Sequence, residues 1–342
     1  MFLGRYFYLL NIFFLQKEKL SFVFYRRCFF IFFLYLCFYK YSINMAQYYR
    51  DFGSWLHEEF NFKVQKISID AGFTCPNRDG SIGKGGCIYC DNRTFNPSYC
   101  SVENKSVTRQ IEEGKRFFSG KYPNMKYLAY FQAYTNTYGD IQHLKRLYSE
   151  ALQVEDVVGI VIGTRPDCVS EDLLNYFTEL NKVTFLLVEY GIETVNDATL
   201  RLINRGHTFA CSRQMIERTA ARGIRVGAHI ILGLPGEDRQ ESLRQAPIIS
   251  SLPLTTLKIH QMQIIRGTKL AKMYVENPFH LYTVDEYIKL IADYISLLRK
   301  DLVLERFVSQ SPDNLLLAPK WGLKNYEFTN KLNSYLERIR KV

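Results

Sequence analysis

Three cysteines lie close together in the sequence, within the segment AGFTCPNRDGSIGKGGCIYCDNRTF. They are Cys75, Cys87 and Cys90, separated by eleven and by two residues. Thiolates are soft ligands that select iron–sulfur clusters, zinc or copper(I). The CxxC pair allows two sulfurs to reach one metal centre. Four glycines between the first two cysteines give the loop the freedom to fold back and bring Cys75 alongside them. The segment therefore predicts a thiolate metal site.

The number of cysteines distinguishes the possible metal sites. A structural zinc site needs four closed ligands, and most [4Fe–4S] clusters are also held by four cysteines. Cys100 is the obvious candidate for a fourth ligand and would complete a zinc ribbon. However, nine residues separate it from Cys90 without a second CxxC, and no histidine lies nearby. We therefore favour a [4Fe–4S] cluster with three cysteines, which leaves one iron open to a substrate or cofactor.

Composition limits the class of protein. With 342 residues, of which 47% are hydrophobic, the chain can form one large α/β domain with an appendage. Eight cysteines in a chain of this length do not suit a small secreted disulfide scaffold, so we expect a cytoplasmic protein. The net charge is +10, and residues 1–44 carry five of these positive charges. The mildly basic remainder is compatible with a nucleic-acid partner and equally with an ordinary soluble enzyme.

The first 44 residues contain two apolar blocks, at 6–15 and 28–38. The second block has eleven residues, whereas a transmembrane helix needs about 20. A signal peptide is a poor fit because no small-residue cleavage site follows. A weak membrane anchor, an interfacial segment and an over-extended translation start remain open. We favour Met45 as the true start, so membrane contact is expected only if residues 1–44 belong to the protein.

Beyond this extension, short β-rich runs alternate with helix-like stretches. The predicted strands are 64–70, 127–132, 157–163, 183–190, 225–232 and 256–265, and the predicted helices are 107–118, 141–153, 171–180, 211–222 and 239–250. Asp140, Ser170 and Ser212 are candidate N-caps. This alternation predicts βαβ units and a parallel sheet, either open or curled into a barrel. The cysteine loop follows the first strand, and ligands in such folds bind at the carboxyl ends of strands.

The last region, 276–342, reads mainly as helices, including 284–300 and 326–340. A short run at 302–304 is its one clear strand candidate. We expect this region to close or cover the barrel.

The phrase CPNRDGSIGKGGCIYC resembles the YhcC/YtqA-type radical S-adenosylmethionine (SAM) proteins, which are similar to the catalytic subunit of Elongator. The resemblance continues through AYTNTY, GTRPDCV, VEYGIET, INRGH, HIILGLPGE, KIHQMQIIRGT and APKW. It extends from about Met45 to the C-terminus. The common superfamily spacing is Cx3Cx2C, and this chain departs from it by a longer first interval, as occurs in the Elongator-like branch.

The resemblance implies an α/β fold, an incomplete (β/α)6 TIM-type barrel with a helical C-terminal extension. The barrel would span 45–275, after a hydrophobic extension at 1–44, and the C-terminal extension would span 276–342. It implies that Cys75, Cys87 and Cys90 hold a [4Fe–4S] cluster that cleaves SAM and generates a 5′-deoxyadenosyl radical. The resemblance does not identify the substrate: RNA modification and small-metabolite chemistry are both open, although no RNA-binding appendage is recognisable. The electron would come from a donor such as flavodoxin or ferredoxin.

The resemblance also implies a set of SAM contacts. Tyr89 would lie near the adenine, and Gln132, Thr135 and Asn136 would lie where the family binds the methionine amino group. Their amide and hydroxyl groups differ from the acidic side chains usual there.

Four further contacts involve later motifs. Glu189 and Glu193 would lie where related enzymes contact ribose or methionine, and as strand residues at i and i+4 they would point to the same side. Arg205 would bind the SAM carboxylate and His229 the ribose. Gly233 would allow close approach of the backbone to the adenine.

Alternatives remain for these residues and for the whole chain. Glu189, Glu193 and Arg205 could be ordinary ion-pair members, and His229 a core histidine. Lys258 and His260 lie on one face of the predicted strand 256–265. They could contact the substrate or form an inward structural pair. The chain itself could be a non-catalytic Fe–S and SAM-binding sensor, or a zinc-ribbon binding module.

Overall fold

The computed structural model describes residues 48–94, 105–120 and 124–340, all within the unit Tyr48–Val342. The predicted extension at 1–44 and the candidate ligand Cys100 lie outside these residues. Within the described ranges, no helix combines the length and the apolar composition needed to cross a membrane.

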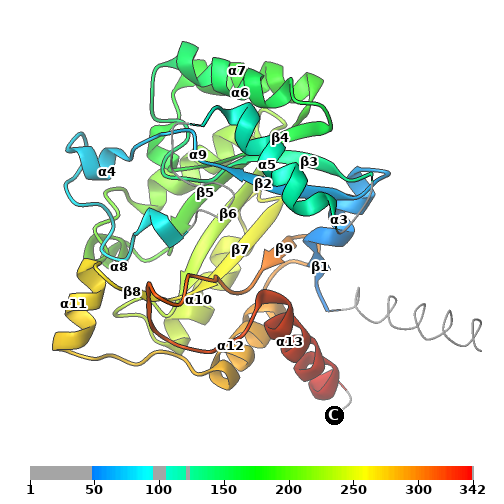
Figure 1. Cartoon of the computed structure of the whole chain (residues 1–342). Coiled ribbons are helices and arrows are strands. Elements are labelled where there is room, and N and C mark those ends of the chain that lie inside the picture. Colours follow the sequence, from blue (N-terminus) through cyan, green and yellow to red (C-terminus); the bar gives the residue numbers. More distant parts are fainter. Residues whose placement is uncertain (1–47, 95–104, 121–123, 341–342) are drawn as a thin grey trace, which may run out of the picture. The chain divides into compact units, whose positions relative to one another are not determined.

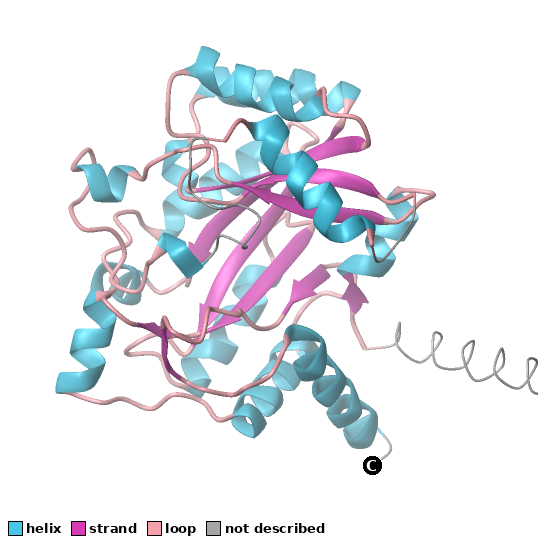
Figure 2. Ribbon diagram, viewed as in Figure 1, coloured by secondary structure: helices cyan, strands magenta, loops and turns pink. Residues whose placement is uncertain are grey.

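An eight-stranded parallel sheet forms the centre of the fold, in the order β1-β9-β7-β6-β5-β4-β3-β2. Its strands are β1 (Arg50–Asp51), β2 (Val64–Ile69), β3 (Lys126–Phe131), β4 (Val157–Thr164), β5 (Phe185–Glu193), β6 (Arg225–Leu232), β7 (Thr256–Gln261) and β9 (Val303–Arg306). The sheet is curved and has helices along its outside (Figure 2). These features confirm the α/β class and the incomplete TIM-type barrel.

Helices connect successive strands, as Figure 1 shows. They are α3 (Phe52–Glu59), α5 (Val107–Ser119), α6 (Ile141–Leu152), α7 (Glu171–Val183), α8 (Asp197–Leu202), α9 (Phe209–Ala220), α10 (Arg239–Ser250), α11 (Lys269–Glu276), α12 (Val284–Ser296) and α13 (Asn325–Arg340). Asp140 and Ser170 cap α6 and α7 as predicted. The N-cap prediction for Ser212 is wrong. The Thr208 hydroxyl accepts from the Cys211 amide and starts α9 earlier, which leaves Ser212 buried inside the helix.

Two predicted strand boundaries are also wrong. Val183 is the last residue of α7, and β5 begins at Phe185. The predicted strand at 256–265 divides into β7 and β8 (Ile264–Ile265), and β8 pairs antiparallel with β10 (Leu316–Ala318) in a separate small sheet. β10 was not predicted. β-Branched residues already precede β5 at Val183 and Thr184, and apolar and polar residues remain interspersed from Ile259 to Ile264, so composition alone does not mark these boundaries.

The C-terminal region contributes to the main sheet as well as covering it. β9 pairs with β7 on one side and with β1 on the other. Helix α13 confirms the predicted helix at 326–340, whereas α12 begins at the predicted Val284 but ends at Ser296, four residues before the predicted end.

Side chains on the inner face of the sheet fill the barrel at the amino ends of the strands. Leu128, Leu187 and Val303 pack there against Trp55 of α3, which is 2% exposed. Alternate residues on the same strands, such as Phe131 and Val188, face the helices in the main core. The packed interior at the amino ends leaves the carboxyl ends as the place for an open cavity.

Candidate functional site

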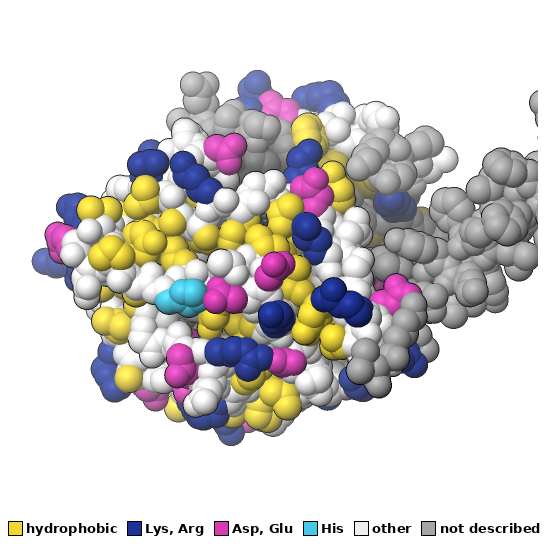
Figure 3. Space-filling model, turned by 90° about the horizontal axis from the view of Figure 1, so that it is seen from below, with side chains coloured by type: hydrophobic (Ala, Val, Ile, Leu, Met, Phe, Trp, Pro, Cys, Tyr) yellow, Lys and Arg dark blue, Asp and Glu magenta, His cyan; other side chains and the backbone are white. Residues whose placement is uncertain are grey.

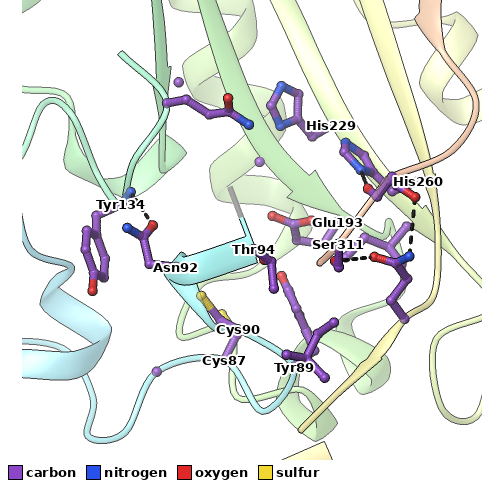
Figure 4. Close-up of a pocket in the computed structure, with 18 of the residues that line it drawn as sticks. Cys87, Tyr89, Cys90, Asn92, Thr94, Tyr134, Glu193, His229, His260 and Ser311 are labelled. Carbon is purple, nitrogen blue, oxygen red and sulfur yellow. Dashed lines mark hydrogen bonds between the residues drawn. The ribbon is translucent and has the colours of Figure 1, made fainter. Parts of the chain in front are cut away.

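A cavity of about 710 Å³ lies at the carboxyl ends of the strands and is lined by Cys75, Cys87 and Cys90. Strand ends contribute further walls, including Thr164 of β4, and His229 of β6 projects toward the same space (Figure 4). The cysteines and the carboxyl ends of the strands thus face one cavity, as expected for a parallel α/β fold.

The cysteine loop (residues 75–90) folds back on itself. Cys75 directly precedes the short helix α4 (Pro76–Asp79). The Asn77 carbonyl accepts from the Gly86 amide at 2.8 Å, while the Asn77 side-chain amide donates to the carbonyl of Asn204 at 2.6 Å. A Cβ at Gly83 would lie 2.2 Å from Asn77 Oδ1, so this close approach requires glycine. The long interval between the first two cysteines therefore forms a compact turn beside the other two.

Hydrogen-bond donors surround the sulfur atoms. Arg205 Nη1 and Asn77 Nδ2 each lie 3.7 Å from Cys87 Sγ, and Arg78 donates to the Cys90 carbonyl at 2.7 Å. Burial and the neighbouring Cys87 together raise the pKa of the Cys90 thiol to about 11. A coordinated metal deprotonates such a thiol outright. Hydrogen bonds to sulfur are one means by which proteins set the potential of an iron–sulfur cluster.

Buried polar atoms test whether these residues fit a cluster and SAM. Arg165 Nη1 and Arg205 Nε are buried without a hydrogen-bond partner, in residues that line the cavity and are 2% and 7% exposed. Unpaired guanidinium N–H groups suit an anionic occupant such as a thiolate-bound cluster or a carboxylate. No three His, Cys, Asp or Glu side chains in the described ranges come together tightly enough for a single ion. The donor set fits a larger cluster with a carboxylate-bearing ligand.

Seven of the nine residues predicted to contact SAM line the same cavity as the cysteines: Tyr89, Gln132, Thr135, Glu189, Glu193, Arg205 and His229. Two do not. Asn136 is buried and donates from its amide to the Gly163 carbonyl at 2.8 Å. Gly233 lines a second cavity, and a Cβ there would lie 3.1 Å from the Tyr282 ring.

Arg205 is held at the end of β5. Its Nη2 donates to the Gly191 carbonyl at 2.6 Å and lies 3.4 Å from Glu193 Oε1. Burial alone would lower the pKa of Arg205, but Glu193 and Cys87 outweigh burial and raise it, so the guanidinium stays charged. The register with β6 shifts between Gly191 and Glu193, and Glu193 has a φ of 68°. Both predicted glutamates reach the cavity, although the strand between them is not the regular run assumed.

Glu189 belongs to a buried ion-pair cluster, which we define as Lys66, Glu189, Lys258 and Glu305. Glu189 accepts from Lys66 Nζ at 2.8 Å and from Lys258 Nζ at 2.6 Å, and Glu305 lies 2.8 and 3.2 Å from the same two ammonium groups. His229 Nε2 lies 2.9 Å from Glu189 Oε2. The lysines thus hold Glu189 in place beneath His229.

The pKa values of the cluster follow from these contacts. Burial alone would raise the pKa of Glu189, but Lys258 and Lys66 outweigh it and hold this pKa well below its usual range. Burial lowers the pKa of Lys258 to about 8, despite both carboxylates. Lys258 is therefore an inward ion-pair member, whereas His260 on the same strand lines the cavity.

Several cavity residues were missed by sequence reasoning. Arg78 and Arg165 lie within CPNRDG and GTRPDCV, so the motifs already contained a signal in two arginines beside polar turns. Arg306 and Ser309 also line the cavity. They come from the region after 276, where no motif marked them.

Comparison with known proteins agrees with this geometry. The radical SAM superfamily matches residues 75–244, and the radical SAM C-terminal domain matches residues 254–338. The chain is 35% identical to the uncharacterized protein YtqA of Bacillus subtilis, over 86% of this chain and 91% of that protein. It is 32% identical to the protein YhcC of Escherichia coli, over 83% of this chain and 91% of that protein.

A solved structure shares the fold. The archaeal Elp3 of Methanocaldococcus infernus superposes with a TM-score of 0.60 and 18% identity, over 81% of this chain and 63% of that chain. The family matches do not favour a zinc ribbon or a binding-only sensor. The chain belongs to the radical SAM superfamily and is an Elongator-like member similar to YtqA and YhcC.

Proposed function

We propose that this chain is an enzyme that binds a [4Fe–4S] cluster through Cys75, Cys87 and Cys90 and uses SAM to begin radical chemistry. The observation that carries the proposal is one cavity lined by three thiols together with Arg165 and Arg205, each of which has one buried nitrogen without a hydrogen-bond partner. When bound, a reduced cluster of this kind supplies the electron that cleaves SAM to methionine and a 5′-deoxyadenosyl radical, which abstracts hydrogen from a substrate.

The chain's own residues would bind and orient SAM. Arg205 is charged and buried, so it suits bidentate binding of the SAM carboxylate. Gln132 and Thr135 would accept from the amino group, and Tyr89 would pack beside the adenine. His229, fixed by Glu189, would contact the ribose.

Asn136 and Gly233 would act indirectly. Asn136 anchors the Gly163 carbonyl, which belongs to the cavity wall. Gly233 has a φ of 84°, and its lack of a side chain leaves space for the Tyr282 ring beside the backbone. It would therefore fix the turn after β6.

Anaerobic purification tests the cofactor and the reaction separately. We expect about four irons per chain with visible absorption, and formation of 5′-deoxyadenosine and methionine after reduction with dithionite in the presence of SAM. Zinc without iron would refute the cluster. A cluster that yields no 5′-deoxyadenosine would refute the enzymatic role and favour a sensor.

The electron donor and the substrate are further parts of the proposal. We propose that flavodoxin or ferredoxin supplies the electron in place of dithionite. The substrate is an RNA nucleotide or a small metabolite. Mass spectrometry of RNA nucleosides and metabolites, with and without the gene, distinguishes these two classes.

A further inference from the structure

Arg306, the last residue of β9, lines the cavity but has no carboxylate partner. In the part of the chain that the structure describes, no Asp or Glu forms an ion pair with it, and its Nε is buried without a hydrogen-bond partner. Its Nη2 lies 3.5 Å from His260 Nε2. A guanidinium with a buried N–H group unsatisfied is poised to bind an acceptor that the protein itself does not provide.

The neighbouring charges leave Arg306 uncompensated. In the ion-pair cluster, two ammonium groups face two carboxylates and balance them. Burial, together with the cations Lys258 and Arg306, lowers the pKa of His260, and burial with Lys258 lowers the pKa of His229. Both imidazoles are therefore neutral near pH 7. One partly buried positive charge, that of Arg306, remains on this side of the cavity.

His260 fixes the orientation of the guanidinium. Its Nδ1 contacts the Ser309 hydroxyl, and its Nε2 faces Arg306. Ser309 is in turn held by Gln261, which donates to its carbonyl at 2.9 Å and accepts from its amide at 2.6 Å. In Figure 4, His260 and Ser311 lie on the opposite side of the pocket from Tyr134, with Cys90 between them in this view. The oriented Arg306 thus belongs to a different wall from Arg78, which lies beside Tyr134.

We propose that the substrate carries an anionic group, a carboxylate or a phosphate, and that Arg306 binds this group, with His260 as its positioning residue. The inference rests on the proposed function and names the class of substrate for that cavity. The planar guanidinium matches both oxyanions in a bidentate geometry that an ammonium cannot reproduce. A substrate anchored there would extend from Arg306 toward the cysteine side of the cavity.

Equilibrium binding of inorganic phosphate tests the proposal in the cluster-loaded protein. SAM is kept saturating and the cluster unreduced, so that Arg165 and Arg205 are already occupied. We expect saturable phosphate binding that Arg306→Gln weakens about ten- to hundredfold, the usual effect of losing a charged hydrogen bond. Arg306→Lys should weaken it less. Arg338→Gln, a change at an exposed arginine of α13, is the matched control and should bind as the parent protein does.

The outcomes separate this inference from the proposed function. Equal phosphate binding by the parent protein and Arg306→Gln, or no saturable binding by the parent, would overturn the anion site. SAM binding and uncoupled 5′-deoxyadenosine formation are measured in the parent protein, because they report on the cysteines and on Arg205, which carry the proposed function. Failure of the parent protein to form 5′-deoxyadenosine would instead overturn the proposed function.

Competition identifies the source of the anion. A short single-stranded RNA that displaces phosphate from the parent protein indicates a nucleic-acid phosphate. Displacement by small carboxylates or phosphate monoesters, but not by RNA, indicates a metabolite. Either result supports an anionic substrate at Arg306, provided that the same competitor displaces no phosphate from the Arg306→Gln variant.

Discussion

The cysteine loop and the ion-pair cluster border the same cavity but are built in different ways. The loop takes its three thiols from sixteen consecutive residues, 75–90. It is tied to the rest of the fold through Asn77 and Asn204 and through backbone hydrogen bonds of Ile88. The cluster takes one charge each from β2, β5, β7 and β9. A ligand-binding loop can therefore be changed without disturbing the sheet, whereas each charge of the cluster depends on the other three. We expect substitutions in the loop to affect cofactor binding and substitutions in the cluster to affect stability.

The largest effect is expected from Cys87→Ala. With one thiolate lost from three, the cluster should be absent, so iron content, visible absorption and 5′-deoxyadenosine formation should all fall to background. Cys211→Ala, which changes a partly buried cysteine of α9, is the control and should retain the cluster. Thermal unfolding of the cluster-free forms should differ little between the two variants. An intact cluster in Cys87→Ala would contradict the assignment of the metal site.

Glu189→Gln should have the next largest effect, on stability. It leaves Lys66 and Lys258 buried with one carboxylate between them, and breaking a buried pair in this way costs about 3–5 kcal/mol. Chemical denaturation measures the loss. Glu179→Gln, at an exposed pair with Lys182, should change the free energy of unfolding by less than about 0.5 kcal/mol. A Glu189→Gln protein as stable as the parent would remove the contrast between the two regions.

Arg205→Lys should act on SAM affinity. An ammonium keeps the charge but loses the bidentate geometry, so SAM binding to the unreduced protein should weaken about tenfold. Arg213→Lys, on α9 and outside the cavity lining, should bind SAM normally. Unchanged affinity in Arg205→Lys would mean that this arginine only supports the strand end through Gly191.

The smallest effect is a pH dependence that originates in Lys258. Its pKa is lowered to about 8 in the folded protein from an ordinary 10.5, so between these pH values unfolding takes up a proton. The free energy of unfolding should therefore rise with pH across this window, with a slope that corresponds to the uptake of at most one proton. Lys66 does not cancel the rise, because its raised pKa takes effect only above 10.5. Unfolding midpoints of the parent and Lys258→Met measured from pH 7.5 to 10.5 should diverge, and parallel curves would refute the lowered pKa.

Much of the fold followed from local patterns. Six runs of β-branched and aliphatic residues become neighbouring strands β2 to β7 in chain order, because short right-handed crossovers bring consecutive strands together. β1 and β10 were not predicted, since strands of two or three residues carry no periodicity. The capping error at Ser212 has a similar origin, because Thr208 offers the same hydroxyl four residues earlier.

Local motifs marked the three cysteines, the family and seven cavity residues that we predict to contact SAM, because ligands delivered by one loop and by strand ends are recorded in short motifs. Only the tertiary structure decided that Glu189 is held by two lysines and that Gly233 faces Tyr282. It alone brought Arg306 to the cavity. The physical reason is that charge balance in a buried site is a sum over strands distant in sequence. An arginine without a carboxylate partner, such as Arg306, can be recognised only when the positions of all neighbouring charges are known.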